Sequence, residues 1–561
     1  MNRNRFSSLL CSLVVLFALN SCSIGIRKSL ENRPDLTNYD TVRPQITKLN
    51  DSLFTFNKNF LIKNKYGQWE TYVEGNPVER GLIIGALTDS LMNKQEDIFL
   101  SKIDDFIPEE KKRMRILKYV RWYNRKMYKY IPEEFKAEIW GQSRFASDKY
   151  NFVANSYTRS LYLHAAHDIG HALLDMNMLD CTSAALWGDE TEDGSMIIGR
   201  NLDFYVGDEF AENKIIYFVK PDKGIPFASV SWPGFLGVVS GMNKEGLTVT
   251  MNAGKSKIPW KAKEPISVVA RTILQYASNI DEAIEIASKS EVFVSEALMI
   301  GSANDKKAVI IEMSPKNFGV YEVINNRLVC SNHFQSKPYK KDKRNQDAIV
   351  NSHSQYRFDR MNELIDDVPK VNPESMVDIL RNKEGLKDLE IGYGNEKALN
   401  QLIAHHGVVF KPEQGIMWVS SNPYQLGSFT GYNLNEIFDE NRTTKYKPLH
   451  IDSLTIEEDN FVHSETFKRY EEYRVQDRII DKMLADESKV FTFDEKIVSD
   501  YRALNPNLWI VHYKAGMLYY KSKQYAEAAE CFKKALTKEV TTLPDSEQIS
   551  KMLKKSKRKA R

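Results

Sequence analysis

Two clusters of reactive side chains lie close together in the first half of the chain. The stretch HDIGH, residues 167–171, places His167 and His171 four positions apart. Two histidines with this spacing share one face of a helix and can bind zinc, with an acidic residue between them as the base. The stretch Cys181-Thr182-Ser183 follows, and its cysteine is a candidate nucleophile.

The zinc interpretation has three weaknesses. Asp168 stands where a zinc-protease helix carries a longer glutamate, and no third-ligand motif follows. Gly170 disfavours the helix by about 1 kcal/mol relative to alanine. A polar helix face at a domain junction explains the same residues, so metal binding by His167 and His171 is kept as a secondary hypothesis. No cofactor is predicted.

Cys181 has a plausible chemical environment in a predicted hairpin. Apolar residues recur with period two from Cys181, and the acidic turn at 189–194 returns the chain toward Asp203. If Cys181 faces Asp203, then Arg200 also lies beside the thiol. A cation there lowers the pKa of a thiol (about 8.5) and of an α-amine (about 7.7–8.0), and Asp203 could hold such an amine. The amine exists only if the thiol attacks the Asp180 carbonyl and the 180–181 bond breaks.

These residues resemble a known family. Cys181-Thr182-Ser183 followed by GRNLDF, residues 199–204, is similar to the N-terminal-nucleophile cysteine amidohydrolases. This family includes acid ceramidase, N-acylethanolamine acid amidase, choloylglycine hydrolases and the penicillin acyltransferase group. The resemblance covers about 181–435, and residues 75–85 resemble the opening motif of the acyltransferase branch. It implies self-cleavage before Cys181.

The resemblance implies three further site residues. In the family, the segment like GMNKEGL (241–247) leads to an asparagine that polarises the scissile carbonyl, which is Asn252 here. CSNHF (330–334) resembles the strand end that supplies a second polar group, Asn332. SQYR (354–357) resembles the segment whose arginine lies in the site, Arg357. Amide donors about 3 Å from a tetrahedral oxyanion stabilise it, which agrees with these roles.

Each residue also has a structural explanation when it is taken alone. Cys181 could be a small core residue, Arg200 and Asp203 a surface ion pair worth under about 1 kcal/mol, Asn252 and Asn332 turn residues, and Arg357 one charge of an amphipathic helix. Their joint occurrence in this order favours the enzyme.

The N-terminus predicts export. Basic residues precede an apolar run at 9–19, which suits a signal peptide and is short for a membrane span. The sequence Leu19-Asn20-Ser21-Cys22 resembles a bacterial lipobox, so we expect residues 1–22 to be a lipoprotein signal peptide with its anchor at Cys22. The protein would then be bound to a membrane of the bacterial cell envelope and face the periplasm. An ordinary signal peptide is the alternative.

Charge and cysteine content narrow the function further. The net charge of +3 does not indicate nucleic acid binding. Beyond the signal region, Cys181, Cys330 and Cys531 remain, and an odd number makes a poor disulfide framework. We therefore expect at least one free thiol, with Cys330 and Cys531 in the core.

The chain divides into four predicted parts after the signal peptide. We expect a polar tether at 23–50, a mostly helical pro-segment at 51–180, a catalytic domain of strands and helix pairs at 181–440, and a helical region at 460–561. Residues 508–544 match one tetratricopeptide-type repeat. The predicted class is α+β, and the resemblance implies the αββα four-layer sandwich of Ntn hydrolases.

The predicted activity is hydrolysis of a linear amide. The resemblance implies a small-molecule N-acyl amide as substrate, an acyl-enzyme on Cys181, and two cleaved fragments that stay associated. Acyl transfer to an amine acceptor is a second hypothesis. A third is a lipid-anchored interaction protein that uses its repeat-type helices and has an inactive catalytic fold.

Overall fold

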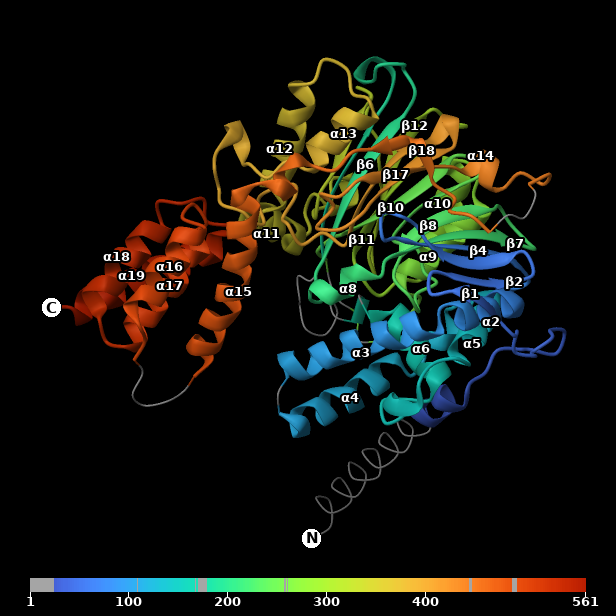
Figure 1. Cartoon of the computed structure of the whole chain (residues 1–561), viewed down its shortest axis with the longest axis horizontal. Coiled ribbons are helices and arrows are strands. Elements are labelled where there is room, and N and C mark those ends of the chain that lie inside the picture. Colours follow the sequence, from blue (N-terminus) through green and yellow to red (C-terminus); the bar gives the residue numbers. More distant parts are fainter. Residues whose placement is uncertain are drawn as a thin grey trace, which may run out of the picture.

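A computed structural model describes residues 25–107, 109–166, 168–169, 179–256, 259, 261–442, 446–486 and 492–561 of the chain. The predicted signal peptide, Cys22, His167 and His171 lie outside the described residues. Figure 1 shows two β-sheets, with the N-terminal helices below them and the C-terminal helices on one side. The expected α+β class and the helical C-terminal region are confirmed.

The larger sheet has eleven strands and is mainly antiparallel. In spatial order they are β1 (Thr47–Asn50), β2 (Leu53–Phe56), β3 (Asn59–Lys63), β4 (Trp69–Gly75), β7 (Ile215–Pro221), β8 (Phe227–Ser231), β9 (Ser240–Asn243), β10 (Leu247–Ala253), β11 (Glu296–Ser302), β12 (Lys307–Met313) and β13 (Phe318–Tyr321).

The smaller sheet has seven strands. In spatial order they are β14 (Arg327–Cys330), β5 (Leu179–Leu186), β6 (Ile197–Phe204), β15 (His406–Lys411), β16 (Ile416–Ser420), β17 (Phe429–Asn433) and β18 (Ile451–Ile456). The strands predicted between residues 181 and 420 are present, with ends that differ by a few residues.

The two sheets share one apolar core. On β7, Ile216 and Phe218 belong to a cluster that also contains Ile198 and Phe410 of the smaller sheet. The alternate residues Ile215, Tyr217 and Val219 belong to a different cluster. Because successive side chains of a strand point to opposite faces, the period-two pattern builds both cores at once.

Helices pack on the outer face of each sheet. Alongside the larger sheet, α9 (Ile266–Tyr276) and α10 (Ile280–Lys289) share a core with its outward-facing residues. Alongside the smaller sheet, α12 (Ser354–Asp366) and α13 (Pro373–Leu380) share a core with Val409 and Trp418. A shorter helix, α11 (Lys343–Asn351), precedes α12.

The N-terminal part departs from the prediction. We expected a tether over 23–50 and mostly helices over 51–180, but residues 47–75 form β1–β4 of the larger sheet. The tether is also wrong at Leu36 and Tyr39, which pack against helices. β1–β4 pair as consecutive antiparallel neighbours, and only the parallel pairing of β4 with β7, far along the chain, has no local signal in the sequence.

A short helical segment at 25–31 precedes the strands, and the remaining N-terminal helices follow β4. They are α2 (Pro77–Leu87), α3 (Asp89–Phe106), α4 (Glu110–Asn124), α5 (Glu133–Ser143) and α6 (Ser156–His164). At Gly81, a Cβ would lie 2.0 Å from the Glu138 carbonyl oxygen, so only glycine lets α2 and α5 approach this closely. Arg80 beside it donates to the Glu138 carboxylate at 2.8 Å. Residues of the motif at 75–85 therefore pack α2 against α5.

The C-terminal helices form their own core. They are α15 (Glu465–Ala485), α16 (Glu495–Leu504), α17 (Trp509–Lys521), α18 (Tyr525–Ala535) and α19 (Leu543–Lys559), and one cluster of apolar residues joins them to Leu402 and Leu426. The predicted repeat falls on α17 and α18, and its assignment as a tetratricopeptide type stays a prediction. None of the described helices is long and apolar enough to span a membrane.

Candidate active site

The β5–β6 hairpin sets the register around Cys181. Cys181 pairs with Leu202, and Asp180 pairs with Asp203, so the expected pairing of Cys181 with Asp203 is wrong by one residue. The turn explains the shift, because Gly188 donates its N–H to the Gly194 carbonyl and thereby fixes the length of the loop. In this register Cys181 shares a face of the sheet with Arg200, while Asp203 lies on the other face.

Arg200 contacts the thiol directly. Its Nη2 lies 3.3 Å from Cys181 Sγ and also donates to the Met251 carbonyl, while Nη1 donates to Ser240 Oγ. Both Cys181 and Arg200 are fully buried. Burial raises the pKa of the Cys181 thiol to about 12, against the opposing effect of Arg200. The thiol is therefore neutral in the uncut chain.

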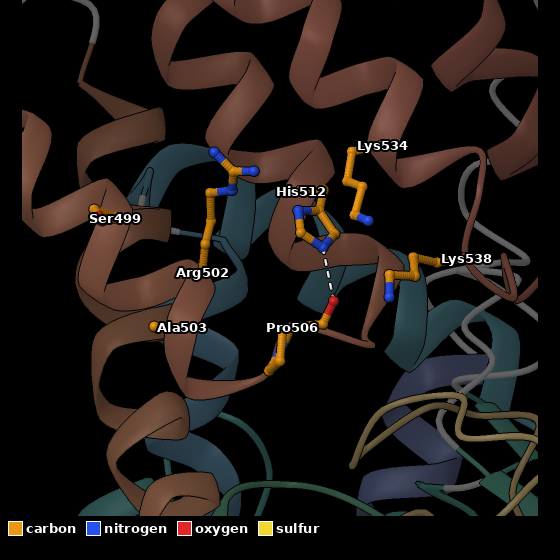
Figure 2. Close-up of a pocket in the computed structure, with 7 residues that line it drawn as sticks. All are labelled: Ser499, Arg502, Ala503, Pro506, His512, Lys534 and Lys538. Carbon is orange, nitrogen blue, oxygen red and sulfur yellow. Dashed lines mark hydrogen bonds between the residues drawn. The ribbon is translucent and has the colours of Figure 1, made fainter.

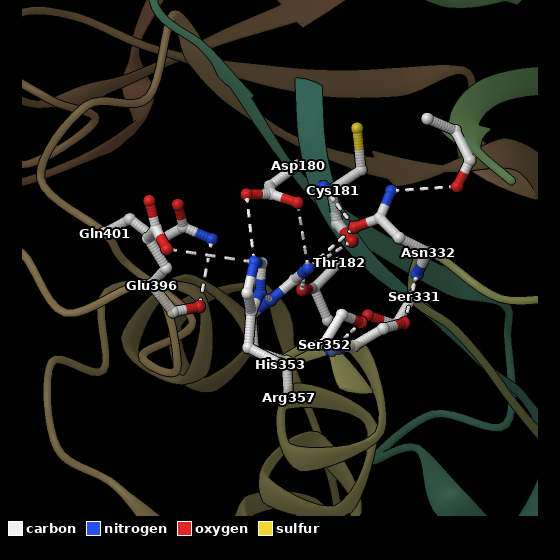
Figure 3. Close-up of polar contacts among 12 residues, drawn as sticks. Asp180, Cys181, Thr182, Ser331, Asn332, Ser352, His353, Arg357, Glu396 and Gln401 are labelled. Carbon is white, nitrogen blue, oxygen red and sulfur yellow. Dashed lines mark hydrogen bonds and ion pairs between the residues drawn. The ribbon is translucent and has the colours of Figure 1, made fainter. Parts of the chain in front are cut away.

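Asn332 lies beside the nitrogen of the 180–181 peptide bond. It follows β14, and its Oδ1 accepts the Cys181 N–H at 3.0 Å. Its Nδ2 donates to the Ala253 carbonyl of the larger sheet at 3.0 Å. Figure 3 shows Asn332 beside Cys181. Asn332 thus bonds to the nitrogen that cleavage would convert to an amine.

Arg357 reaches the other side of the same residues from α12 (Figure 3). Its Nη1 donates to the Cys181 carbonyl and to Thr182 Oγ1, each at 2.7 Å. Its Nη2 donates to Asn332 Oδ1 at 2.7 Å and to Asp180 Oδ1 at 3.3 Å. One buried guanidinium therefore fixes the backbone and side chains on both sides of the bond.

Asp203 is buried without the partner that a carboxylate needs. Neither of its carboxylate oxygens has a hydrogen-bond donor among the described residues. Burial raises the pKa of Asp203 to about 8, and Arg357 and Arg200 oppose that rise. Because Asp203 stands opposite Asp180 in the hairpin, it lies one residue from the Cys181 nitrogen.

Asn252 lies nearby but is engaged elsewhere. It sits on β10, where its Oδ1 accepts from Ser183 Oγ at 3.1 Å and its Nδ2 donates to the Cys330 carbonyl at 3.3 Å. Its amide thus bridges the two sheets instead of bonding to Asp180 or Cys181. The oxyanion role expected for it stays a prediction.

Three polar residues beneath Arg200 were not foreseen. Ser240 Oγ, which accepts from Arg200, lies 2.8 Å from His406 Nε2, and His406 Nδ1 lies 2.8 Å from His405 Nδ1. They come from β9 and from the start of β15. Only the order of strands in space brings them to Arg200, so no spacing in the sequence reveals them.

His353 was also missed, although a signal for it exists. Arg357 Nε donates to His353 Nδ1 at 3.2 Å, and His353 Nε2 lies 3.6 Å from Asp180 Oδ2. His353 precedes Arg357 by four residues, the spacing that places two side chains together along a helix. That spacing next to the SQYR motif could have identified it.

The described part of the histidine cluster has structural roles. His164 donates from Nδ1 to the Ser160 carbonyl and accepts the Leu236 N–H at Nε2, both at 2.8 Å. Asp168 accepts the Ile266 N–H at 2.8 Å at the start of α9. Within the described ranges, no group of three His, Cys, Asp or Glu side chains could hold a metal. His167 and His171 lie outside those ranges.

The cysteines in the described residues are free. Cys181, Cys330 and Cys531 are buried and form no disulfide. This agrees with the expectation of at least one free thiol and with the core positions expected for Cys330 and Cys531.

Known proteins match the central part of the chain. Residues 190–422 match the family model of acyl-coenzyme A:6-aminopenicillanic acid acyl-transferase. This range includes Arg200, Asp203, Asn252, Asn332 and Arg357, and it begins after Cys181. An uncharacterized protein from Archaeoglobus fulgidus is 25% identical over 276 residues, which cover 45% of this chain and 45% of that protein. The chain thus matches under half of that relative's length.

Two solved structures are similar over a similar share of the chain. A Caenorhabditis elegans N-acylethanolamine-hydrolyzing acid amidase ortholog is 19% identical, covering 42% of this chain and 93% of that one, with a TM-score of 0.31. A mutant conjugated bile acid hydrolase from Clostridium perfringens is 15% identical, covering 48% of this chain and 96% of that one, with a TM-score of 0.32. Similarity at this level does not establish a shared activity.

The family match agrees with the order of motifs from GRNLDF to SQYR. It confirms, for residues 190–422, the resemblance to the penicillin acyltransferase group of the N-terminal-nucleophile cysteine amidohydrolases.

Proposed function

We propose that the chain is a cysteine amidohydrolase that cleaves its own Asp180–Cys181 bond and then hydrolyses a linear N-acyl amide through an acyl-enzyme. One observation carries this proposal: Arg200, Asn332 and Arg357 converge on a single cysteine and its preceding peptide bond. The packing of two sheets between helices supports an αββα sandwich of the Ntn type.

The first reaction would be an acyl shift within the chain. Cys181 Sγ adds to the Asp180 carbonyl, the thiol proton passes to the Cys181 nitrogen, and the carbon–nitrogen bond breaks to leave a thioester and a free α-amine. Water then adds to the thioester and releases the Asp180 carboxylate and the thiol. Arg357 supports this step because it holds Asp180 and the Cys181 carbonyl in fixed positions.

The cut would complete the site. The new α-amine is a general base with a pKa near 7.7–8.0 in model compounds. It has two ready acceptors, Asn332 Oδ1, which already accepts from this nitrogen, and the unpartnered carboxyl group of Asp203. Arg200 would favour the thiolate once solvent reaches the sulfur. The amine and thiol could then act on an external amide in the same way.

The acyl group of the substrate would be apolar. Phe204 pairs with Leu179, two residues before Cys181, and lines a cavity of about 50 Å³ together with Phe99, Phe210, Trp232 and other residues. In the uncut chain this cavity lies at the end of β6. Asp180, which forms the acyl side of the cleaved bond, pairs with Asp203 near that same end of the strand. A series of N-acyl amides of increasing chain length would measure how much of it the substrate uses.

Acyl transfer is the second candidate function. The matching family is described as an acyl-transferase, and the same thioester can react with an amine in place of water. Incubation of purified protein with a labelled N-acyl amide, with and without an added amine, separates the two activities. Free acid alone supports hydrolysis, and a new labelled amide supports transfer.

Self-cleavage is tested by intact mass and N-terminal sequencing. We expect wild-type protein to give a C-terminal fragment that begins Cys-Thr-Ser-Ala, and Cys181→Ala to stay uncut. Cys330→Ala, which also removes a buried free thiol, is the matched control and should cleave normally. A single uncut species from folded wild-type protein would contradict the proposal and favour a lipid-anchored interaction module with anchor Cys22.

A further inference from the structure

A second polar site lies among the C-terminal helices, and none of its lining residues belongs to the cleavage site. It is a cavity of about 420 Å³, here called the basic pocket (Figure 2). Its lining residues are Ser499, Arg502, Ala503, Pro506, His512, Lys534 and Lys538. Three of them are cationic and none is acidic.

The cations of the basic pocket lack the partners that neighbouring cations have. Lys514 of α17 lies 2.8 Å from Asp477, and Lys496 of α16 lies 2.5 Å from Asp500. In the part of the chain that the structure describes, Arg502 and Lys534 make no ion pair. The repulsion between them is therefore not offset by a carboxylate in the lining.

Lys538 reaches a carboxylate only through an intermediary. Its Nζ donates to Asn507 Oδ1 at 2.6 Å, and Asn507 Nδ2 donates to Glu390 at 2.7 Å. Partial burial and the nearby Lys534 lower the pKa of Lys538. The arrangement leaves the ammonium group at the pocket wall with capacity for further acceptors, because an ammonium group has three N–H donors.

Two buried atoms at the pocket also lack a partner. The side chain of His512 is buried at 3% exposure, and its Nε2 bonds to the Pro506 carbonyl at 2.9 Å. Its Nδ1 and the Nε of Arg502 have no hydrogen-bond partner among the described residues. Figure 2 shows the His512 ring between Arg502 and the two lysines. Both atoms are therefore available to a ligand that enters the pocket between the cations.

We propose that the basic pocket binds the phosphate group of a phosphate ester, either a soluble one or a lipid headgroup. A phosphate dianion offers charge and several acceptor oxygens to three converging cations. It would also accept from Arg502 Nε and, with a proton on the phosphate or on the ring, bond to His512 Nδ1. This site requires no activity at Cys181.

Calorimetric titration of the full chain with inorganic phosphate tests the proposal. We expect saturable binding that Lys534→Gln and Arg502→Gln each weaken about tenfold, the loss of one charge-assisted contact. Lys533→Gln is the matched control, because it removes the preceding charge of α18 without changing the pocket lining, and it should leave the dissociation constant within about twofold.

Two results would overturn the proposal. One is the absence of phosphate binding at concentrations up to about 20 mM, which is 20-fold above the dissociation constant of a weak ligand, about 1 mM. The other is equal weakening by Lys533→Gln and Lys534→Gln, which would show diffuse attraction to the surface.

The source of the phosphate is assigned by sedimentation with vesicles of phosphatidylcholine, with and without phosphatidic acid. Binding to phosphatidic acid that inorganic phosphate displaces assigns a lipid headgroup. Phosphate binding without vesicle binding assigns a soluble ester. Vesicle binding that inorganic phosphate does not displace would place the lipid elsewhere and count against the pocket.

Discussion

The cleavage site and the basic pocket use arginine in opposite ways. At the cleavage site, Arg200 and Arg357 are fully buried and their terminal nitrogens are occupied by carbonyl, hydroxyl, amide and thiol groups of the chain itself. In the basic pocket, Arg502 is only partly buried and stands with Lys534 and Lys538 without a carboxylate in the lining.

The difference separates two kinds of function. A cation whose partners belong to the chain fixes geometry, and its loss exposes several buried acceptors at once. A cation whose partners are absent costs stability through repulsion and gains from a ligand. The following substitutions test this distinction, starting with the largest expected effect.

Arg200→Met should destabilise the fold far more than Arg502→Met. Loss of Arg200 leaves the buried Met251 carbonyl and Ser240 without their donor, so we expect the free energy of unfolding to fall by about 3–5 kcal/mol. Arg502→Met should change it by under about 0.5 kcal/mol. Urea unfolding in a Cys181→Ala background, where all proteins stay uncut, measures both. Equal losses of unfolding free energy in the two variants would contradict the distinction between a structural and a ligand-binding arginine.

Arg357→Met should slow self-cleavage by about 10²-fold, because Arg357 holds the Asp180 side chain and the Cys181 carbonyl on either side of the reacting bond, and a small misplacement of reacting groups costs about this much. Arg360→Met on the same helix is the control, since Arg360 is equally buried but pairs with Glu363 and Asp388. We expect it to lower stability and to change the cleavage rate by under about threefold. The measurement is the half-time of fragment formation on gels. Equal slowing by both variants would indicate a general loss of folding.

Asp203→Asn should remove a pH dependence of stability. The pKa of Asp203 is about 8 in the fold and about 3.9 in an unfolded chain. Between these values the unfolded chain has released the proton and the fold still holds it, so stability falls as pH rises and levels off above about 8. Relative to Asp203→Asn, the Cys181→Ala protein should lose about 2–3 kcal/mol from pH 5 to pH 7. Parallel pH profiles of the two proteins would contradict the buried, protonated state.

Lys534→Gln should have the smallest effect, and it should be stabilising. Removing one of three neighbouring cations relieves repulsion worth about 0.5 kcal/mol at low salt and almost nothing at high salt. Lys533→Gln shares the same helix end and controls for the helix dipole. Thermal midpoints at low and high NaCl concentration measure the difference. A salt-independent effect would mean that the pocket cations do not repel one another.

Local patterns predicted the strands around the site but not their partners. The strands expected between residues 181 and 420 lie close to those observed, because alternation and turn residues are local properties. The hairpin register was wrong by one because the turn from Gly188 to Gly194 determines it. Strands β1–β4 were missed although they pair as consecutive antiparallel neighbours, and only the pairing of β4 with β7 lies beyond local patterns.

The site was predictable to the extent that its residues lie in motifs. Arg200, Asn332 and Arg357 come from three separate motifs and each bonds to Cys181 in the fold, while their catalytic roles stay predictions. The groups that hold Arg200 in place, Ser240 and His406, belong to strands that meet only in the folded sheets. The basic pocket likewise combines three helices, and no motif marks it.

The parallel pairing of β4 with β7 has a consequence for the order of events during maturation. β4 precedes the bond at 180–181 and β7 follows it, so a cut there leaves one sheet built from two polypeptides. The single chain folds in a unimolecular reaction, whereas the nicked protein could refold only by bimolecular assembly. Its recovery from denaturant would therefore depend on protein concentration, and folding would have to be complete before the peptide bond is broken.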